Sequence, residues 1–168
     1  MKSLIAQTTS VYKINITPQT NVRATQGDKV FFRIPREKLY KSGLSRLMRL
    51  ERYNQYKIDL LTLCRVNKFN IPSQGLCIRF FIPMPKTWKK WQREVMNGKL
   101  HRQKPDIDNL LKAVLDSLLA EDKHIGHLGE ISKRWTDSER GWIEFEVKEA
   151  PYEEAVTIKS SRKLITGG

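Results

Sequence analysis

The chain has 168 residues, of which 39% are hydrophobic, and this suits one domain that can bury its own core. Lysine and arginine number 31 against 18 aspartates and glutamates, so the net charge is +13 and the pI is near 9.9. No apolar run approaches the roughly 20 residues of a membrane span, and Cys64 and Cys77 stand outside any zinc-binding spacing. These features exclude a membrane-spanning helix and a zinc scaffold, and they favour a protein that binds a polyanion.

The N-terminal half of the chain predicts two strands and one long helix. Residues 11–16 (VYKINI) alternate apolar and polar side chains and stop before Pro18, which is typical of a half-buried strand. Residues 29–34 (KVFFRI) form a second strand candidate that Pro35 ends. Apolar residues recur near helical spacing from 44 to 63, with no proline or glycine, which predicts an amphipathic helix. The first sixteen residues lack a signal-peptide core, so we expect a cytoplasmic protein.

The middle of the chain predicts a strand followed by two helices. Residues 76–82 (LCIRFFI) are typical of a buried strand, and both cysteines are expected to be buried thiols. Residues 86–96 (KTWKKWQREVM) predict a basic helix that ends at Asn97-Gly98. Residues 110–119 place six apolar side chains on one stripe, the strongest helix signal in the sequence.

Two further strands are predicted at residues 130–135 and 142–147, joined by a turn near Gly141. Residues 149–168 show no firm periodicity, so we expect one domain over residues 1–148 and a loosely held tail after it. The order of strands and helices predicts an α+β (mixed α/β) fold, with a small mixed sheet packed against helices.

Positive charge is concentrated in two stretches. Residues 29–57 carry nine basic side chains against two acidic ones, and residues 79–104 carry eight against one, so each stretch has a local charge of +7. Either stretch alone could be a solvated helix surface, but two of them beside one acidic motif favour nucleic acid. The side chains that we expect to contact DNA phosphates are Lys86, Lys89, Lys90, Arg93, Arg46, Arg49, Arg52 and Lys104, with Arg23 and Lys29 as further candidates.

The acidic motif is KPDIDNLL, residues 104–111. Pro105 disfavours a helical conformation for Lys104, so we expect an extended entry in which Asp106 and Asp108 point to the same side. Asp108 stands where a helix N-cap belongs. Within the helix, Lys112 and Asp116 follow at intervals of four residues and share a face with Asp108.

Two carboxylates that converge repel each other unless a cation lies between them. Magnesium favours carboxylate and water ligands, and it leaves positions open for a substrate phosphate. Lys112 is placed to assist at that phosphate. Spacing alone leaves a structural alternative open, namely a turn, an N-cap and a surface ion pair between Lys112 and Asp116.

Residues 82–125, from IPMPK through NGK and KPDIDNLLKAVLD to EDKHI, resemble the RusA family of Holliday junction resolvases, particularly the forms found in bacterial prophages. The resemblance implies a homodimeric endonuclease of mixed α/β fold that depends on Mg²⁺, with Mn²⁺ able to substitute. Such an enzyme makes paired symmetric nicks across four-way junction DNA.

The resemblance also implies roles for individual residues. The two close aspartates of the family match Asp106 and Asp108, the motif lysine matches Lys112, and the helix aspartate matches Asp116. The third metal-binding aspartate matches Asp122, in a shorter spacing than the family pattern. Glu121 replaces the first acid of that pair and could share or take its role.

Two other pairs of residues have alternative interpretations. His124 and His127 could suggest zinc, but no further nitrogen or sulfur ligand stands in a suitable context, so ordinary histidines are favoured. Trp88 and Trp91 could stack on unpaired bases, although core packing or a dimer contact is the favoured interpretation. The alternatives for the whole protein are a non-catalytic basic DNA-binding module, or a metal-dependent nuclease for another branched DNA or for RNA.

Overall fold

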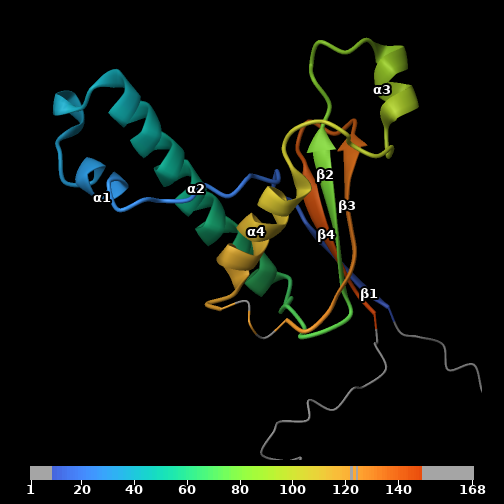
Figure 1. The fold of residues 1–168 in the computed structure, drawn as a ribbon. Helices are drawn as coiled ribbons and strands as arrows, with labels where there is room; N and C mark the ends of the chain where they lie inside the picture. The colour runs from blue at the N-terminus through green and yellow to red at the C-terminus, as the bar shows by residue number, and fades with distance from the viewer. Residues whose placement is uncertain (1–8, 122, 124, 149–168) are drawn as a thin grey trace, which may run out of the picture.

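One mixed β-sheet, covered on one face by two helices, organises the chain (Figure 1). The structure is a computed structural model that describes residues 9–121, 123 and 125–148. Its elements are β1 (Ser10–Ile14), α1 (Asp28–Phe31), the 3-10 turn η1 (Arg36–Lys38), α2 (Lys41–Val66), β2 (Leu76–Pro83), α3 (Lys90–Met96), α4 (Ile107–Leu118), β3 (Leu128–Thr136) and β4 (Trp142–Val147). This is the predicted α+β fold in a single domain.

The strand order in the sheet is β1-β4-β2-β3. Strand β4 is antiparallel to both β1 and β2, whereas β2 and β3 are parallel, with Phe80 opposite Lys133. Parallel neighbours need a crossover between them, and here the crossover is the segment that carries α3 and α4. The acidic motif therefore lies inside a connection between two adjacent strands.

The hydrophobic core lies between the sheet and the pair α2 and α4. Alternate residues of the strands point into it, because successive side chains of a strand face opposite sides. Helix α2 contributes Tyr56 and Leu60, and α4 contributes Leu110 and Val114, all of them buried. Figure 1 shows α2 and α4 side by side against the sheet, and α3 standing apart beyond the C-terminal end of β2.

The four strands predicted at residues 11–16, 76–82, 130–135 and 142–147 are confirmed, with shifts of one or two residues at their ends. The helix predicted over 44–63 is α2, and the helix predicted over 110–119 is α4, which begins earlier, at Ile107. Cys64 and Cys77 are both buried, as predicted, and burial raises the pKa of the Cys64 thiol to about 12. None of the helices in the described part of the chain combines the length and apolar character needed to cross a bilayer.

The strand predicted at KVFFRI is wrong, because Asp28–Phe31 is the helical turn α1. The buried Asp28 carboxylate accepts hydrogen bonds from the Thr25 backbone N–H (2.6 Å) and from Arg46 of α2. A Cβ atom added at Gly43 would lie 3.2 Å from the Phe31 ring, so this ring packs closely on α2. Contacts with α2, rather than local strand propensity, decide the conformation of this segment.

The basic helix predicted over 86–96 begins only at Lys90. Residues 85–88 form a turn in which the Trp88 N–H donates to the Pro85 carbonyl (3.1 Å), and Lys89 is extended. The predicted tail, residues 149–168, lies outside the described residues.

Candidate active site

The acidic motif lies at the N-terminus of α4. Asp106 is extended (φ −72°, ψ 143°) and occupies the N-cap position, and its carbonyl accepts the Leu110 N–H at 3.2 Å. The prediction that Asp108 is the N-cap is wrong, because the helix begins directly after Asp106 and Asp108 lies in its first turn. Ile107 is already helical, so the predicted extended entry, which would point Asp106 and Asp108 to the same side, is wrong as well. Both carboxylates are exposed, and the N-terminal end of a helix dipole favours negative charge there.

A groove of about 830 Å³ lies between α4, α2 and the segment that follows β1. Asp108, Lys112 and Asp116 all line it, which confirms that these three residues share one face of α4. Opposite them, α2 contributes Tyr53 and Lys57. The groove therefore carries acidic and basic side chains on facing helices.

Asp106 opens onto a second hollow, of about 470 Å³, which it shares with Lys104. Asn21 and Asn109 line both hollows, so the two are contiguous around the start of α4. A third hollow, of about 410 Å³, adjoins the second at Thr20 and Pro105 and is lined by Arg49 and Arg52. A continuous concave surface thus passes the acidic end of α4.

Asn21 connects the two helices that form the groove. Its side-chain amide donates to Asp116 Oδ2 (2.6 Å) and to the Tyr53 hydroxyl (3.1 Å), and its backbone N–H donates to the Asn109 carbonyl (3.1 Å). Asp116 also pairs with Lys112, with Nζ 2.7 Å from Oδ1. Burial, together with the negative charge of Asp116, raises the pKa of Tyr53. The sequence predicted neither Asn21 nor Tyr53. Asn21 contacts Tyr53 and Asp116, which lie 32 and 95 residues further along the chain, so these contacts leave no local signal.

The loop before Asp106 is anchored by β3. The Lys133 ammonium donates to the carbonyl oxygens of both Gln103 and Pro105. His101 is buried against Trp135, with ring centroids 3.8 Å apart, and its Nδ1 accepts the Gln103 N–H at 3.3 Å. Burial, reinforced by the Lys133 charge, lowers the pKa of His101. These contacts determine where the chain enters the acidic motif.

The described carboxylates at the start of α4 have the donor chemistry of a metal site, but they are too few to form one. Asp106 and Asp108 are exposed oxygen donors beside a groove, and this donor chemistry fits Mg²⁺. In residues 9–121, 123 and 125–148, no group of three or more His, Cys, Asp or Glu side chains could hold a metal ion. Asp122, the predicted third ligand, lies outside the described residues, and Glu121 is exposed and paired with Lys123.

The zinc alternative is not resolved by the positions of the histidines. His127 is exposed, and His124 lies outside the described residues. The preference for ordinary histidines therefore stays a prediction.

The expected phosphate contacts divide into three groups. Arg49, Arg52 and Lys104 line the concave surface near Asp106. Lys86, Lys89 and Lys90 are exposed on and before α3, and none of them lines the hollows beside Asp106. Arg46 and Arg93 instead have protein partners, since Arg46 pairs with Asp28 at 2.9 Å and Arg93 pairs with Asp137 at 2.5 Å. The Arg46 guanidinium therefore joins α2 to α1, and the Arg93 guanidinium joins α3 to the turn after β3.

The two tryptophans of the basic segment have different environments. Trp88 packs on Trp135 with ring centroids 4.9 Å apart, which agrees with the favoured interpretation of core packing. Trp91, on α3, is 61% exposed and is not part of the core.

Fold and site together define a basic α+β protein whose groove carries carboxylates at the start of a crossover helix. Comparison with protein families gives a match to the endodeoxyribonuclease RusA family over residues 14–144, which is most of the chain. The chain therefore belongs to the RusA endodeoxyribonuclease family, as the motif predicted. Comparison with curated proteins and with solved structures found no match.

Proposed function

We propose that this protein is a magnesium-dependent, structure-selective endonuclease that resolves Holliday junctions by paired symmetric nicks, in DNA recombination and repair. Membership of the RusA family supports nuclease activity. The observation that carries the proposal is the position of Asp106 and Asp108, at the start of α4 where two contiguous hollows meet basic side chains. A net charge of +13 supports a polyanionic substrate.

Asp106, Asp108 and Asp122 are the residues that would hold Mg²⁺, with Glu121 able to share the third position. When bound, the ion would activate a water molecule and stabilise negative charge on the phosphate. Lys112 would neutralise the phosphate from within the groove. Asp116 and Asn21 would position the Lys112 ammonium, because Asp116 pairs with Lys112 and accepts a hydrogen bond from Asn21.

A four-way junction has two-fold symmetry, and paired symmetric nicks need two active sites related by a two-fold axis. The proposal therefore includes a homodimer, in which each protomer cuts one strand. It also includes a cytoplasmic location in a bacterial or prophage setting, where such DNA intermediates form.

The first test compares a synthetic four-way junction with matched linear duplex, in Mg²⁺, in Mn²⁺ and in EDTA. We expect paired nicks in the junction only, and only with metal. We expect Asp106→Asn to reduce the cleavage rate by more than about 100-fold, since even the outer partners of metal ligands contribute roughly 10- to 100-fold. Junction binding in EDTA should persist or tighten, because the substitution removes a negative charge near the phosphates.

Asp59→Asn is the matched control, because Asp59 is an exposed carboxylate of α2 whose side chain pairs with Gln55. It should cut like the unmodified protein. Tight binding without cleavage under every metal condition would instead indicate a non-catalytic DNA-binding module. Equal cleavage of flaps or RNA would indicate a nuclease with a different substrate.

A further inference from the structure

A second concave site lies beside α3, apart from the acidic groove. It has a volume of about 320 Å³, and its walls include three indole rings. Its lining includes Trp88, Trp91, Trp135, Gln92, Val95 and Gln103, and we call it the aromatic pocket. It contains no acidic side chain, and the proposed cleavage chemistry does not use it.

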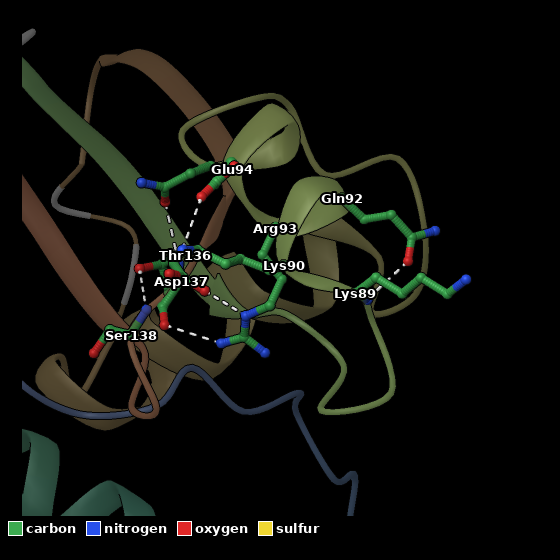
Figure 2. Close-up of polar contacts among 9 residues, drawn as sticks. Lys89, Lys90, Gln92, Arg93, Glu94, Thr136, Asp137 and Ser138 are labelled. Atoms are coloured by element: carbon green, nitrogen blue, oxygen red, sulfur yellow. Dashed lines mark hydrogen bonds and ion pairs between the residues drawn. The ribbon is translucent and has the colours of Figure 1, made fainter.

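Polar contacts join α3, which forms one wall of the aromatic pocket, to the turn after β3 (Figure 2). Arg93 of α3 pairs with Asp137, and the Asn97 side chain accepts the Asp137 backbone N–H at 3.1 Å. These contacts fix α3 to the turn that follows β3, although α3 has no buried residue of its own. Since Trp135 belongs to β3, these contacts join the two walls of the pocket, α3 and β3, in the protein without ligand.

The inner surface of the aromatic pocket is apolar and open to solvent. Trp91 is 61% exposed and Val95 is 60% exposed. Exposed aromatic surface beside a preformed hollow is a common mark of a binding site. The Gln92 amide oxygen accepts the Lys89 N–H at 2.8 Å, and in Figure 2 its amide nitrogen points away from that contact.

The segments that precede and follow α3 in the sequence are basic. Lys89 and Lys90 precede or begin α3, and Lys99, Arg102 and Lys104 follow it, all of them exposed. Indole faces next to basic chain segments suit a nucleobase attached to its phosphates, since bases stack on aromatic rings while the backbone follows positive charge.

The aromatic pocket also lies close to the proposed cleavage site. Gln103 lines the pocket and Asp106 follows three residues later, so their Cα atoms are at most about 11 Å apart. One DNA strand rises about 3.4 Å per nucleotide. The pocket is therefore within roughly three nucleotides of a phosphate held at Asp106. A branch point interrupts the continuous stack of a duplex, so a base beside it can leave the stack at a lower cost.

We propose that the aromatic pocket binds an unstacked nucleobase of the branched DNA, with Trp91 as the main stacking surface. This inference rests on the proposed function, and it adds a base-binding site to it. Such a site selects branched DNA over duplex, because only an unpaired base can enter.

The test uses a four-way junction that carries 2-aminopurine, a fluorescent adenine analogue, at successive positions around the branch point. Binding is measured in EDTA, so that no strand is cut. We expect 2-aminopurine emission to be quenched on binding at a position within about three nucleotides of the cleavage site. Trp91→Ala should abolish that quenching and raise the Kd for the junction by about 5- to 150-fold, the range for one lost stacking contact.

Trp91→Phe keeps an aromatic face and should retain most of the quenching. Tyr40→Ala, which removes an aromatic ring that is 88% exposed at the start of α2, should change neither quenching nor affinity. Circular dichroism should show all three variants folded, since both rings are exposed.

Unchanged quenching and Kd in Trp91→Ala would overturn the inference. Loss of dimer formation in Trp91→Ala, measured by sedimentation, together with unchanged quenching, would also overturn it and make the pocket a protein interface. A protein that quenches 2-aminopurine through Trp91 but cuts no junction in Mg²⁺ would keep the base site and contradict the proposed resolvase activity. The two failures are therefore distinguishable.

Discussion

At the scale of single residues, Asn21 links the two helices that form the walls of the groove. One amide contacts Asp116 of α4 and Tyr53 of α2, and it does so from a segment that belongs to neither helix. Asp116 is therefore occupied by Asn21 and Lys112, whereas Asp106 and Asp108 are exposed at the start of the helix. This difference supports a positioning role for Asp116 and a metal-binding role for the other two.

Lys133 provides a prediction at the same scale. Its ammonium contacts two carbonyl groups of the loop that delivers Asp106, so Lys133→Met should loosen that loop. We expect the Mg²⁺ concentration for half-maximal junction cleavage to rise by roughly 10-fold. Junction binding in EDTA should change little. Cleavage rates over a series of Mg²⁺ concentrations give the measurement.

The matched control for Lys133→Met is Lys13→Met, which removes an equal charge from the ring face of Trp142. Lys13→Met should leave the Mg²⁺ requirement unchanged. Lys133→Arg keeps a donor at this position, so it should raise the Mg²⁺ requirement less than Lys133→Met does. An unchanged Mg²⁺ requirement in Lys133→Met would show that the loop is held by other contacts.

His101 provides a prediction about pH. Its pKa is lowered in the folded protein, by burial and by Lys133, from an ordinary value of about 6.5. Because the unfolded chain binds the proton more readily, the stabilisation is complete above pH 6.5 and is lost as the pH falls below it. We expect the free energy of unfolding, measured with urea, to fall between about pH 6.5 and pH 5.

His101→Asn tests the assignment, because the amide oxygen of asparagine can accept the Gln103 N–H in place of Nδ1. The variant should show a smaller change in stability over the same pH interval. Asp28 and Glu146 also have lowered pKa values. Burial opposes the shift in both, but the hydrogen bond from Arg46 to Asp28 and the one from Arg79 to Glu146 outweigh it. These carboxylates therefore lose their stabilising charge only in more acidic solution. An identical pH profile for the variant and the unmodified protein would contradict the role of His101.

At the scale of elements, α2 and α3 are stabilised in opposite ways. Helix α2 has 26 residues, is about 39 Å long, and buries a residue every three or four positions along its inner face. Helix α3 has seven residues and buries none, so its position depends on Arg93 and Asn97 at the turn after β3. Hydrophobic spacing therefore predicts α2 well, whereas it cannot locate the start of α3.

Helix α2 supplies a stability prediction. Leu60 is fully buried in the core, so Leu60→Ala should lower the free energy of unfolding by about 2–5 kcal/mol. Ile58, two residues away and 58% exposed, is the control, and Ile58→Ala should change that energy by less than about 0.5 kcal/mol. Urea unfolding followed by circular dichroism measures both. An equal loss in the free energy of unfolding for both variants would contradict the placement of Leu60 on the buried face of α2 and of Ile58 on its exposed face.

At the scale of the whole molecule, positive charge lies on both sides of the acidic end of α4. Arg49, Arg52 and Lys104 border the hollows beside Asp106, and further exposed lysines and arginines precede and follow α3 in the sequence. A substrate that meets both groups must extend past the start of α4 in two directions. A duplex and a branched DNA both extend in this way, and the proposed function favours the branched DNA.

The charge distribution predicts a steep dependence of DNA binding on salt. Each phosphate contact releases a counterion and contributes about 0.9 to the slope of log K against log salt. With six to ten contacts, affinity should fall by roughly 10³- to 10⁵-fold between 50 and 200 mM salt. Fluorescence anisotropy in EDTA measures it, and Asp59→Asn should give the same slope. A nearly flat dependence would contradict binding through phosphates.

The sequence by itself determined the features that depend on short-range patterns. Four strands and the helices α2 and α4 followed from periodicity, because a buried face repeats its apolar side chains at the spacing of the element. The acidic motif and the family followed from one contiguous stretch of the chain. Asp108, Lys112 and Asp116 were placed on one face by helix geometry alone, and the groove confirms this.

Only the tertiary structure decided what depends on partners far away in the sequence. Residues 29–34 have the composition of a strand, yet Asp28 pairs with Arg46 and Phe31 packs on Gly43, so α1 forms there. Asn21 reaches the groove through partners 32 and 95 residues away. The aromatic pocket brings α3 together with Trp135 of β3, although the whole of α4 separates them in the sequence. The physical reason is the same throughout, since a side chain's role follows from the groups that folding brings within a few ångströms of it.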